Sequence, residues 1–252
     1  FTITNPVRER RKYSPTLDIE NFGLRESDLE LVFSAGEIVG IGPSKLKAII
    51  NKLKKIYCES IGIEYMYIRD PLKVRWIQNF INVNSNQPNF SKNEKLSILN
   101  SLNKAYTFEN FLQKKYVGQK RFSLEGGESL IPAIDFLINL AAEKGVEEFV
   151  MGMSHRGRLN TLVNIFGKSS RDIFGEFEGK DYEEDIFDGD VKYHLGWTSE
   201  RTSTSGKKIN MNLAPNPSHL ESVDPVVQGI ARAKLENDFD NNTNKVLPII
   251  VH

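Results

Sequence analysis

The stretch that most constrains the fold is an apolar run over residues 148–153, followed by a short polar turn and then an apolar-periodic run. The first run predicts a buried strand. The second, with apolar residues at helical spacing, predicts a helix. A strand that leads directly into a helix is the building block of open α/β sheets, which bind ligands where their strands end. The helical stripe consists of Leu159, Leu162, Val163 and Phe166.

The turn between these two runs carries a histidine, two arginines and a glycine, over residues 154–158. Arg156 and Arg158 offer planar donors suited to a phosphate or a carboxylate. Gly157 allows the backbone to approach a ligand closely. His155 can donate, accept or move a proton near neutral pH. The turn is therefore a candidate anion site, although a solvated basic turn has the same composition.

Composition excludes several classes of protein. The 252 residues include 33 basic and 33 acidic side chains, so no global charge favours nucleic acid or an anionic membrane. The single cysteine, Cys58, excludes an internal disulfide framework and a cysteine-based zinc cluster. No apolar run is long enough to predict a membrane span. The first residue is not methionine and the last residues are apolar, so we expect a piece of a longer chain.

The pattern of predicted elements changes near residue 118. Residues 1–24 predict a surface arm or linker, and residues 25–117 an all-helical region with helices over 72–81, 92–106 and 107–115. From 118 to 252, predicted strands and helices alternate, which favours an α/β fold with a doubly wound, mostly parallel sheet. The further expected elements are helices over 170–179 and 226–236 and strands over 209–214 and 244–251.

All four histidines fall in the second half, each at a predicted strand end or in a turn. We expect His155, His194, His219 and His252 to approach one edge of the sheet. Ser218 and Asn216 add a hydroxyl and an amide beside His219. No two histidines have the spacing of a zinc site, and the chain has no nucleophile elbow or Walker loop. The set predicts a pocket for an anionic substrate and a phosphorylated cofactor.

Residues 37–60 suggest a different function. Gly40-Ile41-Gly42 followed by a lysine-rich helix is similar to a helix-hairpin-helix element, which binds DNA phosphates through helix amides. The alternative is a structural connection with a basic outer face and an inner stripe of Ile49, Leu53 and Ile56. The balanced net charge favours the structural interpretation, so we expect no nucleic-acid partner.

Four ordered motifs resemble one family. They are Lys120-Arg121-Phe122-Ser123-Leu124-Glu125-Gly126-Gly127-Glu128, then residues 152–160, then 189–196 (Gly-Asp-Val-Lys-Tyr-His-Leu-Gly), then Asn216-Pro217-Ser218-His219-Leu220-Glu221. Together they resemble the E1 component of 2-oxoglutarate dehydrogenase, whose fold binds thiamine diphosphate. The resemblance is strong over residues 118–252, and residues 57–66 are similar to the helical N-terminal region of the family. By this resemblance the 37–60 hairpin belongs to the E1 scaffold.

The resemblance implies thiamine-diphosphate-dependent oxidative decarboxylation of 2-oxoglutarate, with the cofactor as electron sink and succinyl transfer to the lipoyl group of E2. By motif match, His155 and His194 are expected to be catalytic and to bind the substrate carboxylates. Ser218 is expected to contact both substrate and cofactor. Arg156 is expected at the cofactor diphosphate, with Leu220 and His252 also lining the cofactor site.

The resemblance also indicates what this chain lacks. The family's acidic Mg²⁺ ligand would follow His252, so no metal ligand is expected here and the 252 residues alone are expected to be inactive. The expected partners are a second E1 subunit in a homodimer, the E2 succinyltransferase and the E3 dihydrolipoyl dehydrogenase. A related E1 acting on 2-oxoadipate shares the motifs and stays an alternative. The expected compartment is the bacterial cytoplasm or the mitochondrial matrix.

Overall fold

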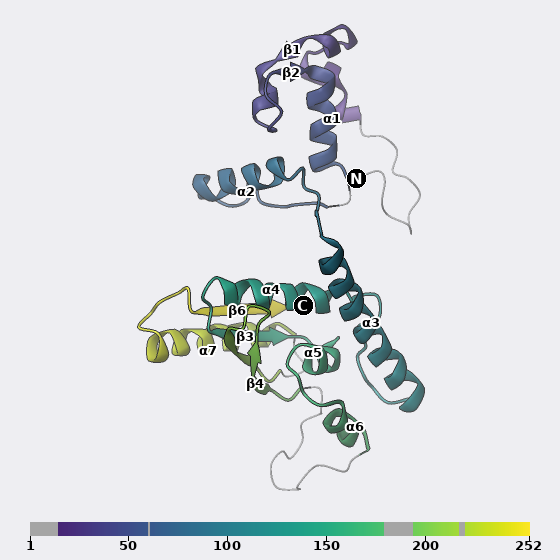
Figure 1. The fold of residues 1–252 in the computed structure, drawn as a ribbon, viewed down its shortest axis with the longest axis vertical. Helices are drawn as coiled ribbons and strands as arrows, with labels where there is room; N and C mark the ends of the chain where they lie inside the picture. Colours follow the sequence, from purple (N-terminus) through teal and green to yellow (C-terminus); the bar gives the residue numbers. More distant parts are fainter. Residues whose placement is uncertain (1–14, 60, 179–193, 217–219) are drawn as a thin grey trace. The chain divides into compact units, whose positions relative to one another are not determined.

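The computed structural model describes residues 15–59, 61–178, 194–216 and 220–252. It comprises two compact units, Phe1–Phe90 and Ser91–His252 (Figure 1). Of the arm expected at residues 1–24, residues 1–14 lie outside the described part. The remainder forms two short 3-10 helices, η1 (Pro15–Leu17) and η2 (Ile19–Phe22).

The described part of the first unit is largely helical. Its main elements are α1 (Leu46–Tyr57) and α2 (Pro71–Val83), with 3-10 helices η3 (Glu26–Glu30) and η4 (Ser34–Glu37). Asp70 caps α2 by accepting hydrogen bonds from the backbone N–H groups of Leu72 and Lys73. The unit also contains a two-residue antiparallel pair, β1 (Val32–Phe33) with β2 (Ser44–Lys45), that the sequence pattern did not reveal. Its core is built from Val39, Ile49, Ile56, Tyr65 and Ile81.

The second unit begins with one long helix, α3 (Lys92–Lys115), where two helices divided at Thr107 were expected. That expectation was wrong. Ser91 and Glu94 form a capping box at the start of α3, and no glycine or proline interrupts residues 92–115. The expected cap at Thr107 lies in the middle of a helix, and the change from polar to aromatic residues there marks only the part of α3 that becomes buried.

A four-stranded sheet forms the centre of the second unit, in the order β4-β5-β3-β6. β3 (Glu148–Met153) is parallel to both β5 (Lys208–Leu213) and β6 (Val246–Val251). β4 (Trp197–Thr202) lies antiparallel at the edge beside β5. The mixed α/β class with a mostly parallel sheet is therefore confirmed. The antiparallel strand was missed because its polar residues alternate between exposed and half-buried positions and leave no apolar run.

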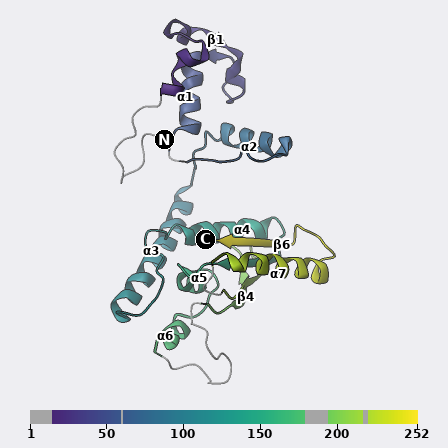
Figure 2. The same ribbon diagram turned by 180° about the vertical axis from the view of Figure 1, so that it is seen from behind.

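Helices cover both faces of this sheet. α7 (Val223–Asp238) packs on one face, where Val150 of β3 meets Val223, Val227 and Ala231. Phe149, Met151 and Met153 of β3 face the opposite side, where they join the core formed with α4 (Leu130–Glu143) and α5 (Arg158–Asn164). Figures 1 and 2 show α4 and α7 on opposite sides of the strands. All six residues of β3 are buried, so this strand is the core of the fold.

Gly152 allows α7 to lie close to the sheet. A Cβ atom at this position would lie 2.5 Å from Cγ2 of Val227 and 3.1 Å from Cγ2 of Val223. Any larger residue would push α7 away from β3. The remaining elements are α6 (Ser170–Glu178) and η5 (Leu220–Ser222).

The compact units divide between Phe90 and Ser91, before the boundary expected between residues 117 and 118. The reason is α3, whose buried residues Ala105, Phe108 and Leu112 belong to the core of the sheet unit. Composition placed α3 with the helices that precede it, whereas packing groups it with the sheet. Among the described residues, no helix is both long and apolar enough to cross a bilayer.

Candidate active site

The turn that joins β3 to α5 is fixed by backbone hydrogen bonds on both sides. The N–H of Ser154 donates to the carbonyl of Val251, at the end of β6, over 3.1 Å. Gly157 precedes α5 with a φ of +76°, a left-handed conformation that glycine adopts without strain. Its N–H donates to the carbonyl of Phe122 over 2.8 Å. The turn predicted from the sequence is thus present, and it presents His155 at the carboxyl edge of the sheet.

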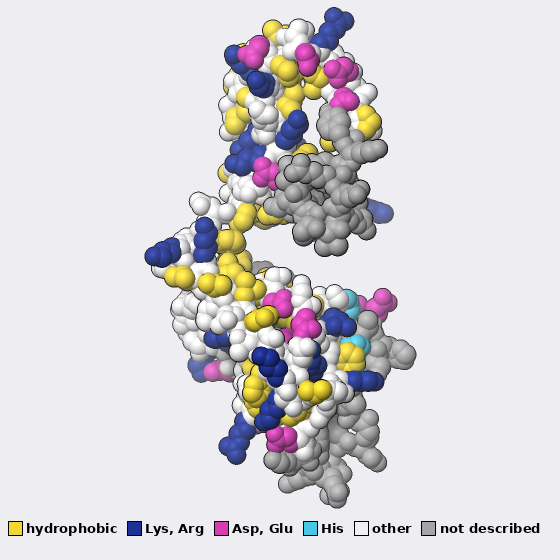
Figure 3. All heavy atoms as spheres, turned by 90° about the vertical axis from the view of Figure 1, so that its right-hand side faces the viewer, with side chains coloured by type: hydrophobic (Ala, Val, Ile, Leu, Met, Phe, Trp, Pro, Cys, Tyr) yellow, Lys and Arg dark blue, Asp and Glu magenta, His cyan; other side chains and the backbone are white. Residues whose placement is uncertain are grey.

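Two of the predicted site residues come together at this edge. The ring centroids of His155 and His194 lie 6.3 Å apart, although 39 positions separate the residues (194 minus 155). The carbonyl of His194 accepts a hydrogen bond from the N–H of Asn216 over 3.0 Å. This bond ties the His194 segment to the chain that follows β5. Figure 3 shows histidine side chains together with basic side chains on one surface of this unit.

The electrostatic surroundings keep His155 neutral. Burial lowers its pKa, and electrostatic interaction with His194 and Arg156 lowers it further. At neutral pH the ring therefore has one N–H donor and one acceptor nitrogen. A neutral imidazole can both donate to a substrate oxygen and accept a proton.

Arg158 has a different role from the one its position in the motif suggested. Its side chain is fully buried, at 0% exposure. Nη1 donates to the carbonyl of Met153, and Nη2 donates to the carbonyls of Leu195 and Ala214. These carbonyls lie at the end of β3, just after His194 and just after β5. Arg158 therefore connects the segments that carry the site, and these two nitrogens are committed to backbone oxygens.

Asn216 contributes a second buried polar group at the same place. It is 1% exposed, and its Nδ2 donates to the carbonyl of Met153, which Arg158 also contacts. Two polar side-chain atoms of the site remain buried without a hydrogen-bond partner among the described residues, namely Nδ1 of His155 and Oδ1 of Asn216. Buried polar atoms are rarely left unpaired in native proteins. These two are the groups that a bound polar ligand would satisfy.

Phe122 forms one wall of the site, and sequence analysis gave it no role. Its ring centroid lies 4.0 Å from that of His155, with the rings inclined at 44°. Its φ is +43°, a left-handed conformation that is unfavourable for a bulky side chain. Such a conformation costs about 1–3 kcal/mol and persists only where neighbouring contacts enforce it. Positive φ at a non-glycine residue leaves no mark in the sequence, so only the structure reveals it.

The predicted cofactor residues are only partly brought together. Arg156 is exposed, and its Nη1 donates to the carbonyl of Ser123 over 3.1 Å. His252 follows β6 at the same sheet edge, where its Nε2 lies 2.8 Å from Oδ1 of Asp224 in α7. Ser218 and His219 lie outside the described residues. Leu220 begins η5, and its side chain is not among those described.

Metal-ligand chemistry is not organised within this part of the chain. In the described ranges, no group of three or more histidine, cysteine, aspartate or glutamate side chains is placed to hold a metal ion. Within the described residues, the site consists of two imidazoles, one exposed guanidinium, one buried amide and an aromatic wall.

The family of the chain follows from comparison with known proteins. The dehydrogenase E1 component family matches residues 101–248, which is most of the sheet unit. The chain belongs to this family, and the resemblance inferred from the four motifs is confirmed.

The relatives make the comparison more specific. The chain is 47% identical over 246 residues to the 2-oxoglutarate dehydrogenase E1 component of Cupriavidus necator, covering 97% of this chain and 26% of that protein. It is 43% identical to the protein of the same name from Azotobacter vinelandii, covering 94% and 25%. It is 44% identical to the multifunctional 2-oxoglutarate metabolism enzyme of Mycolicibacterium vanbaalenii, covering 97% and 20%. The chain thus spans about a quarter or less of the length of these relatives.

Proposed function

We propose that this chain supplies part of the active site of a thiamine-diphosphate-dependent E1 component that oxidatively decarboxylates 2-oxoglutarate. The observation that carries the proposal is the pair His155 and His194, which meets at the carboxyl edge of the parallel sheet. The names of the relatives supply the substrate. The succinyl group would then pass to the lipoyl group of an E2 partner.

The donor set of the site fits such a cofactor. Oδ1 of Asn216, an acceptor, and Nδ1 of His155, a donor or acceptor, are buried atoms with no hydrogen-bond partner in the described part of the chain. Arg156 is exposed beside them and offers charge for a diphosphate. We assign cofactor contacts also to Ser218, Leu220 and His252. When bound, thiamine diphosphate supplies the electron sink that makes loss of carbon dioxide from a 2-oxo acid possible.

The residues of this chain then bind and orient the substrate. We assign His155 and His194 to the carboxylate and keto oxygens of 2-oxoglutarate, where their N–H groups stabilise developing negative charge. Ser218 would add a hydroxyl donor. Because His155 is neutral at pH 7, it can donate to the substrate from one nitrogen while the other accepts a proton. The ring of Phe122 excludes water from one side of His155, which strengthens these interactions.

We place the remaining parts of the enzyme outside this chain. Mg²⁺ ligands, the second subunit of a homodimer, and the E2 and E3 partners belong to the proposal for the whole protein. The relatives named above come from bacteria, which favours the bacterial cytoplasm over the mitochondrial matrix as the compartment.

The test is decarboxylation of 2-oxoglutarate by the full-length protein with added thiamine diphosphate and Mg²⁺, followed with an artificial electron acceptor. We expect activity that depends on the cofactor and falls by about 100-fold or more in His155→Ala and in His194→Ala, since each removes a group at the reacting atoms. Full activity in both variants would contradict the assigned roles.

Two controls sharpen this test. Arg156→Gln should raise the cofactor concentration needed for half-maximal activity, whereas Arg232→Gln, which changes an exposed arginine on α7, should not. Assaying 2-oxoadipate alongside decides the substrate. A higher kcat/KM for 2-oxoadipate would reassign the substrate while leaving the E1 chemistry in place.

A further inference from the structure

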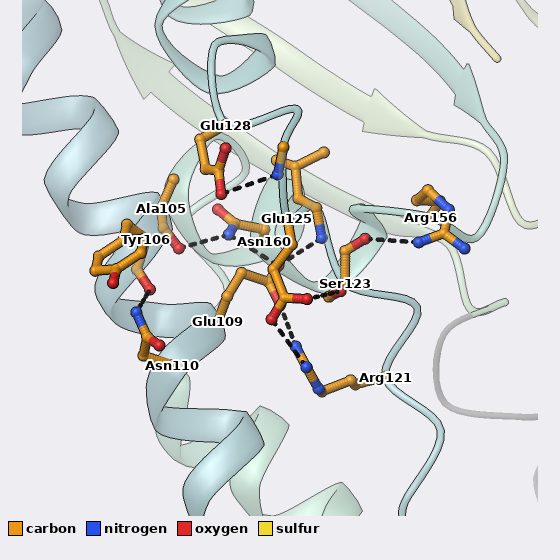
Figure 4. Close-up of polar contacts among 12 residues, drawn as sticks. Ala105, Tyr106, Glu109, Asn110, Arg121, Ser123, Glu125, Glu128, Arg156 and Asn160 are labelled. Atoms are coloured by element: carbon orange, nitrogen blue, oxygen red, sulfur yellow. Dashed lines mark hydrogen bonds and ion pairs between the residues drawn. The ribbon is translucent and has the colours of Figure 1, made fainter. Parts of the chain in front are cut away.

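A buried carboxylate outside the proposed site holds three separate segments together. Glu109 of α3 is 3% exposed. Its Oε1 accepts hydrogen bonds from the backbone N–H of Leu124 and from Nδ2 of Asn160 in α5, both over 3.1 Å. Its Oε2 forms an ion pair with Nη1 of Arg121 over 3.1 Å. Figure 4 shows these groups converging on the carboxylate from α3, α5 and the segment that precedes α4.

Two of these three partners bracket Phe122. Arg121 immediately precedes Phe122, and Leu124 follows it by two positions. Phe122 itself has the unfavourable left-handed backbone conformation and lies against the ring of His155. A residue in such a conformation must be held on both sides, and Glu109 contacts both flanks.

The same segment is also joined to the turn that carries His155. The carbonyl of Phe122 accepts from the N–H of Gly157, and the carbonyl of Ser123 accepts from Nη1 of Arg156. Displacement of the segment would therefore move the aromatic wall and loosen the part of the turn that directly follows His155.

We infer that Glu109 is a positioning residue: by fixing Arg121 and the N–H of Leu124, it holds Phe122 against His155. The kinetic part of this inference rests on the proposed function, because His155 must contact substrate for its position to affect turnover. The structural part concerns only how accessible and how basic His155 is. Glu109 touches neither imidazole of the site itself.

Other contacts distinguish this role from general stabilisation. Arg121 keeps a second carboxylate partner, Glu125, at 2.9 Å from Nη2. Nδ2 of Asn160 also donates to the carbonyl of Ala105 over 2.9 Å. These two partners keep a contact when Glu109 changes, whereas the bond to the N–H of Leu124 is the one that orders the chain just after Phe122.

The experiment compares Glu109→Met with Glu125→Met in the full-length protein, because methionine has a similar length but no oxygen that could accept from the N–H of Leu124. Both variants remove a carboxylate paired with Arg121. Glu125 also accepts from the hydroxyl of Ser123 over 3.1 Å, but within the described residues its carboxylate makes no hydrogen bond to the backbone N–H of Leu124 or to α5, and its side chain is half exposed. The first measurement is the rate at which diethyl pyrocarbonate modifies His155, read by peptide mass spectrometry between about pH 5 and about pH 8. The second is kcat/KM for 2-oxoglutarate.

We expect Glu109→Met to speed modification of His155 by about threefold or more, because Phe122 no longer covers the ring and reagents reach it. The pH midpoint of the modification should rise towards 6.5, since burial is the main cause that lowers this pKa. The value of kcat/KM should fall by about tenfold or more in Glu109→Met, whereas Glu125→Met should change it by less than about twofold. If the Glu109 variant has lower activity but neither the modification rate of His155 nor the pH midpoint of that modification changes, Glu109 has only a general structural role and the inference is overturned.

Phe122→Ala supplies the second test. It should expose His155 as Glu109→Met does, and the double variant should expose it no further, because both changes act through the ring of Phe122. Additive effects would contradict this route. If Glu109→Met does not fold, Arg121→Gln, which releases one flank only, must raise the His155 reactivity or the inference fails. If the variants change the reactivity of His155 as expected but the wild-type protein shows no decarboxylase activity, only the proposed function is refuted.

Discussion

Gly157→Ala is the change whose cost the structure predicts most directly. Gly157 has a φ of +76°, and a Cβ atom there would lie 2.5 Å from Cδ1 and 3.3 Å from Cγ of Leu124. An L-residue in the left-handed region costs about 1–2 kcal/mol. Overpacking a buried side chain such as Leu124 adds about 1–3 kcal/mol. We therefore expect the free energy of unfolding to fall by about 2–5 kcal/mol.

Gly167→Ala separates the two contributions. Gly167 has a φ of +72°, but a Cβ atom there meets nothing within 4 Å. Both substitutions change the entropy of the unfolded chain alike. The difference between the two variants should then equal the packing cost against Leu124, about 1–3 kcal/mol.

Trp197 provides the assay. The chain has two tryptophans, and Trp76 lies in the first unit whereas Trp197 begins β4 in the second. In a Trp76→Phe background, urea unfolding followed by fluorescence reports on the sheet unit alone. If the free energies of unfolding of Gly157→Ala and Gly167→Ala differ by less than about 0.5 kcal/mol, Leu124 moves aside without cost and the packing argument is refuted.

Three further variants test other parts of the unit by the same unfolding assay. Arg158→Lys should lower the free energy of unfolding by about 2–4 kcal/mol, because a single ammonium cannot reach all three buried carbonyls. An unchanged free energy of unfolding would show that these bonds are dispensable. Burial lowers the pKa of His155 in the folded protein, so below about pH 6.5 the unfolded chain binds more protons than the folded chain does. The stabilisation that the neutral ring provides is complete above pH 6.5 and is lost as the pH falls through the lowered pKa of the folded state. His155→Gln should therefore lose less stability than wild type between pH 7 and about pH 5, and a larger loss would contradict the sign. Gly152→Ala should lower the free energy of unfolding by about 1–3 kcal/mol, because the added Cβ pushes on Val227 of α7. Adding Val227→Ala should restore part of this loss; no restoration would show that α7 shifts without cost.

The parts of the site that sequence analysis predicted are those set by local patterns. The apolar run over 148–153 and the following helical stripe are contiguous in sequence, so strand, turn and His155 followed directly. His194 could be assigned to the same edge because the motif resemblance linked it to His155. The pairing of β3 with β5 and β6 also agrees with the alternation of strands and helices.

The parts that were missed depend on contacts between distant residues. Nothing in the sequence distinguishes a guanidinium that binds an anion from one that is buried against three carbonyls, as Arg158 is. Glu109 lies 46 positions before His155 (155 minus 109), in a helix that composition assigned to another region. The backbone strain at Phe122 is set by packing and has no sequence signature.

The central position of β3 also has a consequence for how the protein is made. Glu148 of β3 pairs with Val246 of β6, which is synthesised 98 residues later (246 minus 148). At about 5–20 residues per second, a ribosome needs roughly 5–20 s to cover that distance. Throughout that interval β3, which is completely buried in the finished fold, lacks its β6 neighbour, and until Asp238 has been added it also lacks the complete α7 that covers one of its faces. The strand that anchors the site is thus an apolar segment that chaperones would have to protect during synthesis.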